Sequence, residues 1–175
     1  EAIKYYKYFI DQGFKDHRVF SNYGAILTSL GKLKEAESSQ RKAIELNPDF
    51  AGSHSNLGII LKDLGNLQEA EVSTRKAIEL NPNFAQPHYN LGLILKDLGN
   101  LQEAEVSTRK AIELKHDYSE AHSNLGIILL DLGKLKEAEL STRKAIELNP
   151  NFAEAHFKLG NVLKISGKLQ EAENS

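Results

Sequence analysis

The chain has 175 residues, of which 41% are hydrophobic and 26% charged, a composition typical of a globular protein that buries a core of its own. Its 22 Lys and Arg residues against 24 Asp and Glu residues give a formal net charge of −2, which lacks the basic excess needed to bind nucleic acid or an acidic membrane. The absence of cysteine excludes disulfides, thiolate nucleophiles and Cys-ligated zinc, and it fits a reducing, cytoplasmic location.

A 34-residue period runs through the whole chain. Ten of the twelve glycines fall on two columns at this spacing, which begin at Gly24 and Gly31, and an alanine column passes from Ala2 to Ala36. The chain therefore begins inside a repeat, and we expect it to be a piece of a longer protein. We predict a single array over 1–175, made of a partial repeat 1–16, full repeats 17–50, 51–84, 85–118 and 119–152, and a partial repeat 153–175.

Each full repeat predicts two helices, as repeat 51–84 illustrates. Apolar residues at i, i+3, i+4 and i+7 indicate a first amphipathic helix, which Gly65 ends as a C-cap. Asn66 and Glu69 have the spacing of a capping box for a second helix, which Pro82 stops. Because helices of ~14 residues are marginal alone, neighbouring pairs are expected to stack and share a core. The expected fold is an all-α solenoid.

Two further patterns in the repeats concern stability. Gly58 and Ala70 are small residues where the two helices of a pair must approach each other closely. The second helices carry four Glu–Arg pairs at i, i+4 spacing: Glu37–Arg41, Glu71–Arg75, Glu105–Arg109 and Glu139–Arg143. Such pairs stabilise an exposed helix face by about 0.2–0.5 kcal/mol each and imply no chemistry.

A set of residues in repeat 51–84 resembles the tetratricopeptide repeat family, in the form of bacterial multi-repeat arrays. The set is Asn56-Leu57-Gly58, Leu61, Leu64-Gly65, Glu69-Ala70, Ala77, Leu80 and Pro82. The resemblance implies a right-handed solenoid of antiparallel helix pairs, whose first helices line a concave groove for a protein or peptide. His54 and Thr74 depart from the family, which often has aromatic residues there, and Lys115-His116 replaces one Asn-Pro terminator.

The face of the first helix that points away from its core stripe is the candidate binding site. Ile59 projects roughly 150° from the centre of that stripe. The candidate groove residues are an asparagine column, Asn22, Asn56, Asn90 and Asn124; an apolar column, Ile59, Leu93 and Ile127; a variable column, Ser55, Tyr89, Ser123 and Phe157; and Lys62 and Lys96. Because an amide both donates and accepts hydrogen bonds, we predict that the asparagines bind the backbone of an extended peptide.

Structural alternatives apply to each column. The asparagines are also expected to serve as bonds between neighbouring helices, and the apolar residues as partly buried contacts with the adjacent pair. Sequence differences between repeats fall mainly on the first helix. Neutral change at exposed positions and selection for binding explain these differences equally well. These alternatives stay open at the level of sequence.

Catalysis and metal binding are not expected. The column His54, His88, His122 and His156 comes from successive repeats ~10 Å apart, whereas one ion needs its ligands at about 2.0–2.1 Å. No nucleophile with a base, phosphate-binding glycine loop or carboxylate pair is present. We therefore predict a protein without enzyme activity, cofactor or metal.

The predicted function is a protein–protein interaction module that binds an extended segment of a partner. Some family members bind partners whose C-terminal carboxylates are held by basic residues of the groove. The apolar column disfavours that class of partner here. Two alternatives remain: a structural spacer that self-associates through the array ends or the apolar column, and a substrate-recruiting arm of a larger transferase. A mass that rises with concentration would favour the spacer, and only the sequence beyond Ser175 would reveal a transferase.

Overall fold

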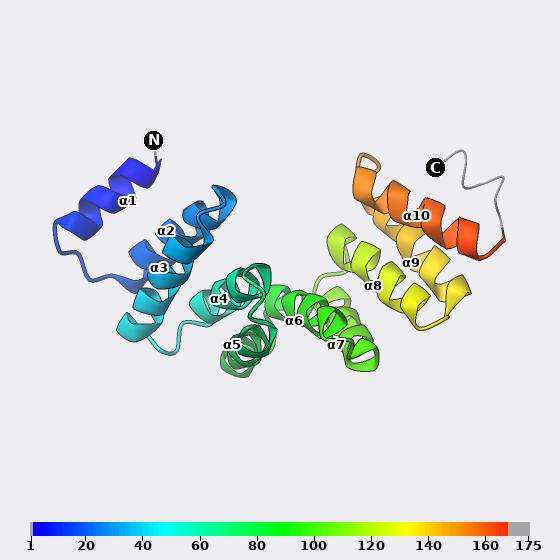
Figure 1. Ribbon diagram of the computed structural model, residues 1–175, viewed down its shortest axis with the longest axis horizontal. Helices are drawn as coiled ribbons and strands as arrows, with labels where there is room; N and C mark the ends of the chain where they lie inside the picture. The colour runs from blue at the N-terminus through cyan, green and yellow to red at the C-terminus, as the bar shows by residue number, and fades with distance from the viewer. Residues whose placement is uncertain (1, 168–175) are drawn as a thin grey trace. The chain divides into compact units, whose positions relative to one another are not determined.

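The computed structural model describes residues 2–167, and within that range it contains ten α-helices and no strand (Figure 1). The helices are α1 (Ala2–Asp11), α2 (His17–Ser29), α3 (Leu33–Leu46), α4 (Ala51–Asp63), α5 (Leu67–Leu80), α6 (Ala85–Asp97), α7 (Leu101–Leu114), α8 (Ser119–Asp131), α9 (Leu135–Leu148) and α10 (Ala153–Ile165). The even-numbered helices are the predicted first helices of the repeats, and α3, α5, α7 and α9 are second helices. The alternation expected from the period is confirmed.

The chain forms two compact units, Glu1–Asn90 and Leu91–Ser175, and each is described by itself. In the first unit α2 pairs with α3 and α4 pairs with α5, while α3 and α2 both contact α4 (Figure 1). In the second unit α8 pairs with α9, α7 packs on α8, and α10 contacts both α8 and α9. Each pair thus rests on the next one within its unit. A single array over the whole chain stays a prediction.

The turn between the helices of a pair depends on a glycine. Gly65 has φ +83°, a left-handed conformation that other residues rarely adopt. Its N–H donates to the carbonyl of Lys62 (2.9 Å), and the next N–H, of Asn66, donates to the carbonyl of Leu61 (2.8 Å). These two bonds close the C-terminus of α4. The predicted glycine C-cap is confirmed.

The predicted capping box at Asn66 is wrong. The Asn66 side chain makes no capping hydrogen bond, and its backbone has φ −87° and ψ 62°. This ψ lies outside the extended region in which an N-cap side chain reaches the first free N–H groups of a helix. The start of α5 is instead secured through the Asn66 carbonyl, which accepts a hydrogen bond from the N–H of Ala70 (3.0 Å).

Small residues let the two helices of a pair approach closely, as predicted. A Cβ atom placed on Gly58 would lie 3.2 Å from the carbonyl oxygen of Ala70 and would collide with Thr74 Oγ1. Gly126 meets Ala138 and Thr142 in the same way. The threonines that stand where the family often has an aromatic residue are fully buried. The contact between α4 and α5, and between α8 and α9, therefore tolerates no side chain at the glycine.

Apolar side chains between successive pairs form the cores. In the first unit Leu27, Ala36 and Ile60 are buried together, and Tyr23 and Leu64 pack on them. The core of the second unit is formed by Leu125, Leu129, Ala138 and Val162.

Among residues 2–167, no helix has the length and apolar character needed to cross a membrane.

The four predicted Glu–Arg pairs are present on the second helices. The N–O distances are 3.1 Å for Arg41–Glu37, 2.8 Å for Arg75–Glu71, 2.9 Å for Arg109–Glu105 and 3.1 Å for Arg143–Glu139. Arg41 also reaches Glu69 of α5 (2.6 Å), and Arg109 reaches Glu137 of α9 (2.7 Å). The same arginines therefore connect second helices of neighbouring repeats.

Candidate functional site: the groove face of the first helices

The candidate groove residues all lie on first helices. Asn22 is on α2, Ser55, Asn56, Ile59 and Lys62 are on α4, Tyr89, Asn90, Leu93 and Lys96 are on α6, Ser123, Asn124 and Ile127 are on α8, and Phe157 is on α10. The columns follow from the period, because equivalent residues of successive repeats occupy equivalent turns of their helices. The columns differ, however, in how much of each side chain is accessible. We use the name groove face for these residues within each unit, Asn22 to Asn90 in the first and Leu93 to Phe157 in the second.

The asparagine column is not uniformly accessible. Asn22 is exposed and Asn56 is half-buried, whereas Asn90 is only 3% exposed. Asn90 Nδ2 donates to the Ser55 hydroxyl (3.2 Å) and carbonyl (3.3 Å), and Asn90 Oδ1 accepts a hydrogen bond from Gln86 Nε2 (2.9 Å). This amide therefore connects α6 to α4. Asn90 therefore fits the structural alternative for the column, in which the asparagine forms a hydrogen bond between neighbouring helices.

Asn124 is also 3% exposed. Its Nδ2 atom is buried and has no hydrogen-bond partner in the part of the chain that the structure describes. Burial of this amide, like that of Asn90, is a correction to the prediction of four amides open to a peptide backbone. The accessible members of the column are Asn22 and Asn56.

The side chains of the variable column also differ in how accessible they are. Ser55 and Ser123 are buried, because this position faces the neighbouring helix pair as well as the groove; Ser55 accepts the bond from Asn90. A direct contact between these serines and a ligand is therefore a second correction. Tyr89 is half-buried, and Phe157 is 70% exposed. The large side chains of the column are the ones that solvent reaches.

The apolar column is partly buried throughout. Ile59, Leu93 and Ile127 are each half-buried, although each projects away from the core stripe of its own helix. Half-buried apolar atoms on a face that the pair itself does not use remain available for a contact. These three residues are the most uniform feature of the groove face.

The two groove lysines are paired with neighbouring acids. Lys62 Nζ lies 3.0 Å from Asp63 Oδ1, and Lys96 Nζ lies 3.3 Å from Asp97 Oδ1. Adjacent opposite charges largely cancel each other's field at a distance. The groove face therefore presents apolar and amide groups between balanced charges.

The N-terminus of α2 carries a charge pair of its own. The Asp16 carboxylate accepts hydrogen bonds from the backbone N–H of Arg18 (2.8 Å) and from its guanidinium (2.6 Å). These bonds lower the pKa of Asp16 to about 2. The hydrogen bond with Asp16 also raises the pKa of Arg18. Asp16 acts as the side-chain N-cap of α2, and Arg18 is held on it.

The histidine column has a structural role in three repeats. Nε2 of His54, His88 and His156 lies 2.8, 2.9 and 3.0 Å from the carbonyls of Pro48, Pro82 and Pro150. Each ring thus binds the loop that precedes its own helix.

In residues 2–167, no group of three or more His, Cys, Asp or Glu side chains is arranged to hold a metal ion. Burial lowers the pKa of His122, which favours the neutral form of its ring.

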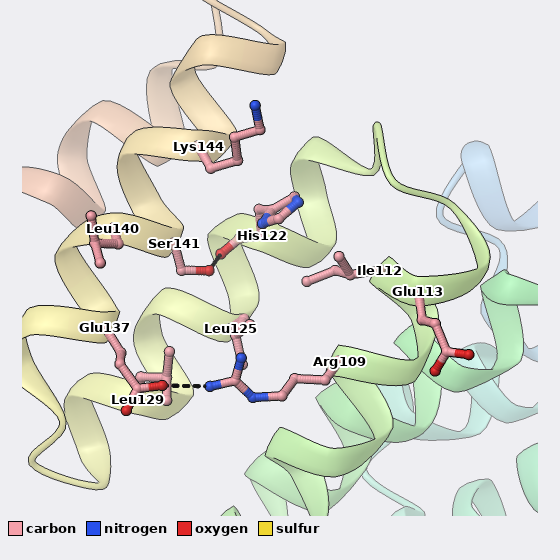
Figure 2. Close-up of a pocket in the computed structure, with 10 residues that line it drawn as sticks. All are labelled: Arg109, Ile112, Glu113, His122, Leu125, Leu129, Glu137, Leu140, Ser141 and Lys144. Atoms are coloured by element: carbon pink, nitrogen blue, oxygen red, sulfur yellow. Dashed lines mark hydrogen bonds and ion pairs between the residues drawn. The ribbon is translucent and has the colours of Figure 1, made fainter.

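A second feature lies on the other side of the first helices and was not predicted from the sequence. In the second unit, residues of α7, α8 and α9 line an open pocket of about 460 Å³ (Figure 2). In the first unit, residues of α3, α4 and α5 line an open pocket of about 520 Å³. The lining of the first-unit pocket, Arg41, Ile44, Glu45, His54, Leu57, Glu69, Val72, Ser73 and Lys76, recurs 68 residues later as Arg109, Ile112, Glu113, His122, Leu125, Glu137, Leu140, Ser141 and Lys144. This correspondence follows from the 34-residue period, because 68 residues are two repeats.

Comparison with known proteins places the chain in a family. Family models described as Tetratricopeptide repeat match residues 51–84 and 119–152, residues 74–106 and 142–174, and residues 17–50. A stretch of 55 residues is 42% identical to the Hsp70-Hsp90 organizing protein of Triticum aestivum, and it covers 31% of this chain and 10% of that protein. The chain therefore spans a small part of that relative.

Solved structures share the fold. YrrB, described as a TPR protein with an unusual peptide-binding site, has a TM-score of 0.71 and 24% identity over 95% of this chain and 86% of YrrB. The pilF protein of Pseudomonas aeruginosa has a TM-score of 0.82 and 22% identity over 90% of this chain and 72% of pilF. The expected all-α solenoid of 34-residue helix pairs is confirmed by these likenesses.

Proposed function

Because the chain belongs to the tetratricopeptide repeat family, which is typical of protein–protein interaction, we propose that it binds an extended segment of a partner protein on its groove face. The observation that carries the proposal is the apolar column. Ile59, Leu93 and Ile127 are half-buried and project from the face of the first helices that pairing leaves unused. Tetratricopeptide repeat proteins are generally not enzymes, and we assign no catalytic role to any residue.

The chemistry of the groove face favours a segment with apolar side chains and no cluster of acids. Lys62 and Lys96 are paired with Asp63 and Asp97, so an acidic tail would have to displace these pairs before it gained a counter-ion. An apolar side chain that contacts Ile59 or Leu93 has no ion pair to displace. A partner held by clamped carboxylates is therefore disfavoured, although a short stretch resembles a chaperone-organizing protein.

Asn22 and Asn56 are the residues proposed to bind the peptide backbone. Both belong to the first unit, and their amides are accessible in whole or in part. An amide side chain offers one acceptor and two donor hydrogens, which match the C=O and N–H groups of an extended strand. In the second unit we assign side-chain recognition to Leu93, Ile127 and Phe157.

The test is selection of binders from a displayed library of short peptides, followed by affinity measurements on variants. The triple variant Ile59→Ser, Leu93→Ser, Ile127→Ser should weaken binding of the selected peptides at least about tenfold, as expected when several buried methylene contacts are lost. Phe157→Ser, at an exposed side chain, should weaken those that contact α10. Helical circular dichroism should be retained in both.

A matched control exists on the second helices. The triple variant Val72→Ser, Val106→Ser, Leu140→Ser removes three side chains that are exposed and lie outside the groove face. It should leave peptide affinity unchanged. Equal losses in the groove and control variants, or no loss in the groove variant, would contradict the proposal.

A further inference from the structure

The side of α8 that belongs to the groove face carries an acid without a basic partner. Asp131 is the last residue of α8, and Ile127 lies about one turn before it, about 40° away around the helix. Asp131 is exposed, and it forms no ion pair among residues 2–167. The second unit therefore presents an uncompensated negative charge beside the apolar residue of its groove face.

The equivalent acids at the ends of α4 and α6 are each paired with the lysine that precedes them. Lys62 Nζ lies 3.0 Å from Asp63 Oδ1, and Lys96 Nζ lies 3.3 Å from Asp97 Oδ1. On α8 the place of this lysine is taken by Leu130, and the last turn of α8 contains no basic residue. Leucine in place of lysine thus leaves the carboxylate that ends α8 without a partner.

The position of Asp131 at a helix C-terminus strengthens its attraction for a cation. The aligned peptide dipoles place about half a negative charge at this end of a helix. The Asp131 carboxylate adds to that field, and no lysine of the same turn offsets it. A Lys or Arg side chain of a bound segment would therefore be stabilised by the carboxylate and by the helix end together.

A second acid lies at the other end of α8. Glu120 is in the first turn of α8, on the same side of the helix as the apolar residue of the groove face. On α10 the equivalent Glu154 is paired with Lys158 (2.6 Å), but on α8 Asn124 replaces this lysine. The Glu120 carboxylate accepts a hydrogen bond from the Ser119 hydroxyl (3.0 Å) and has no ion pair in the described part of the chain. Because the N-terminus of α8 offsets part of this charge, Glu120 is the weaker of the two acids.

We propose that the second unit selects a partner segment in which a Lys or Arg side chain stands close to the apolar residue that contacts Ile127. This inference rests on the proposed function and names the chemistry of the segment. Ile127 and Asp131 are about 6 Å apart along the helix axis, and an extended segment advances about 3.3 Å per residue. The basic residue is therefore expected within two positions of the apolar one.

The first unit lacks this pair of free acids. Gly52 of α4 stands where α8 has Glu120, and Asp63, which stands where α8 has Asp131, is paired with Lys62. A preference for basic residues is therefore expected to arise from the second unit.

The test uses peptides selected on the whole chain from a displayed library. Lys and Arg should be enriched over Asp and Glu within two positions of an apolar residue. Asp131→Asn and Glu120→Gln should each weaken binding of these peptides about twofold to fivefold, as expected for the loss of one exposed ion pair. Added salt should reduce the loss.

Two further variants separate the local charge from the net charge. Leu130→Lys gives α8 the lysine of α4 and α6, so it should weaken binding as much as Asp131→Asn does, although the acid is retained. Glu147→Gln is the matched control. It removes one acid from an exposed pair with Lys144 on α9, outside the groove face, and should leave affinity unchanged.

Three results would overturn the inference: selected peptides without a preference for Lys or Arg, affinities that Asp131→Asn and Leu130→Lys leave unchanged, or an equal loss in Glu147→Gln. In each case the proposed function would stand if the triple variant of Ile59, Leu93 and Ile127 still weakened binding. A library that yields no binder would overturn both.

Discussion

The groove face and the two pockets come from the same repeats but differ in how much they vary. The second helix from Leu67 to Leu80 is identical in sequence to that from Leu101 to Leu114, and the pocket lining recurs with nearly the same residues in both units. The groove face changes from repeat to repeat, from Ser55 through Tyr89 to Phe157. A varied surface suits the distinct side chains of one partner, whereas a uniform surface does not distinguish between them. The predictions below start with the scaffold that both share.

The largest effect is expected at the close contact within a pair. Gly58→Val should destabilise the protein by about 3 kcal/mol, because overpacking forces α4 away from Ala70 and Thr74. Gly65→Ala is the control, since a Cβ there meets no atom and costs only the strain of φ +83°, about 1–2 kcal/mol. Urea denaturation measures both. A smaller loss for Gly58→Val than for Gly65→Ala would refute the tight pairing of the two helices.

A comparison within the asparagine column separates bonding between helices from peptide binding. Asn90→Ala leaves the Ser55 carbonyl without this donor in a buried place and should cost about 1–3 kcal/mol of stability. Asn22→Ala, at an exposed side chain, should change stability by less than about 0.5 kcal/mol. Peptide affinity should fall more for Asn22→Ala than for Asn90→Ala. If Asn90→Ala left stability unchanged, the bond to α4 would have no energetic importance.

The pH dependence of stability should carry a contribution from His122. Burial lowers its pKa in the folded state below the ordinary value of 6.5, so the unfolded chain binds this proton more readily. Stability should therefore fall as the pH decreases below about 6.5, until the folded pKa is passed. His122→Gln should remove this part of the slope, as urea denaturation between pH 5 and 8 would show. An unchanged slope would mean that the ring is not buried as described.

The smallest effect is expected at the arginine bridges between second helices. Arg109 and Glu137 are about half exposed, and exposed pairs contribute about 0.2–1 kcal/mol. Arg109→Gln should therefore lower stability only slightly, and added salt should reduce the difference further. Thermal or urea denaturation at low and high salt measures the difference. A loss well above about 1 kcal/mol would contradict the description of an exposed bridge.

Features that depend on one helix or one turn could be predicted from the sequence. The period places the helices, Gly65 requires a left-handed turn, and Glu105–Arg109 lie on one face because i and i+4 residues are neighbours on a helix. The failure at Asn66 is also local. Residue type and spacing fit a capping box there, but the backbone torsion keeps the side chain from the free N–H groups.

Features that depend on three helices could not be predicted in this way. Asn90 and Ser55 are buried because a neighbouring pair covers positions that look exposed on an isolated helix. The pockets likewise arise where α7, α8 and α9 meet, and no single helix reveals them. One pattern in the sequence does bear on them: His54 and His122 stand where the earlier repeat has Phe20, a bulkier aromatic ring.

Methyl NMR of the chain with a peptide selected from the displayed library tests the central claim most directly. Addition of the peptide should shift the methyl signals of Ile59, Leu93 and Ile127 and leave those of Val72 and Leu140 in place. Shifts confined to Val72 and Leu140, with the three groove residues unmoved, would contradict recognition by the first helices.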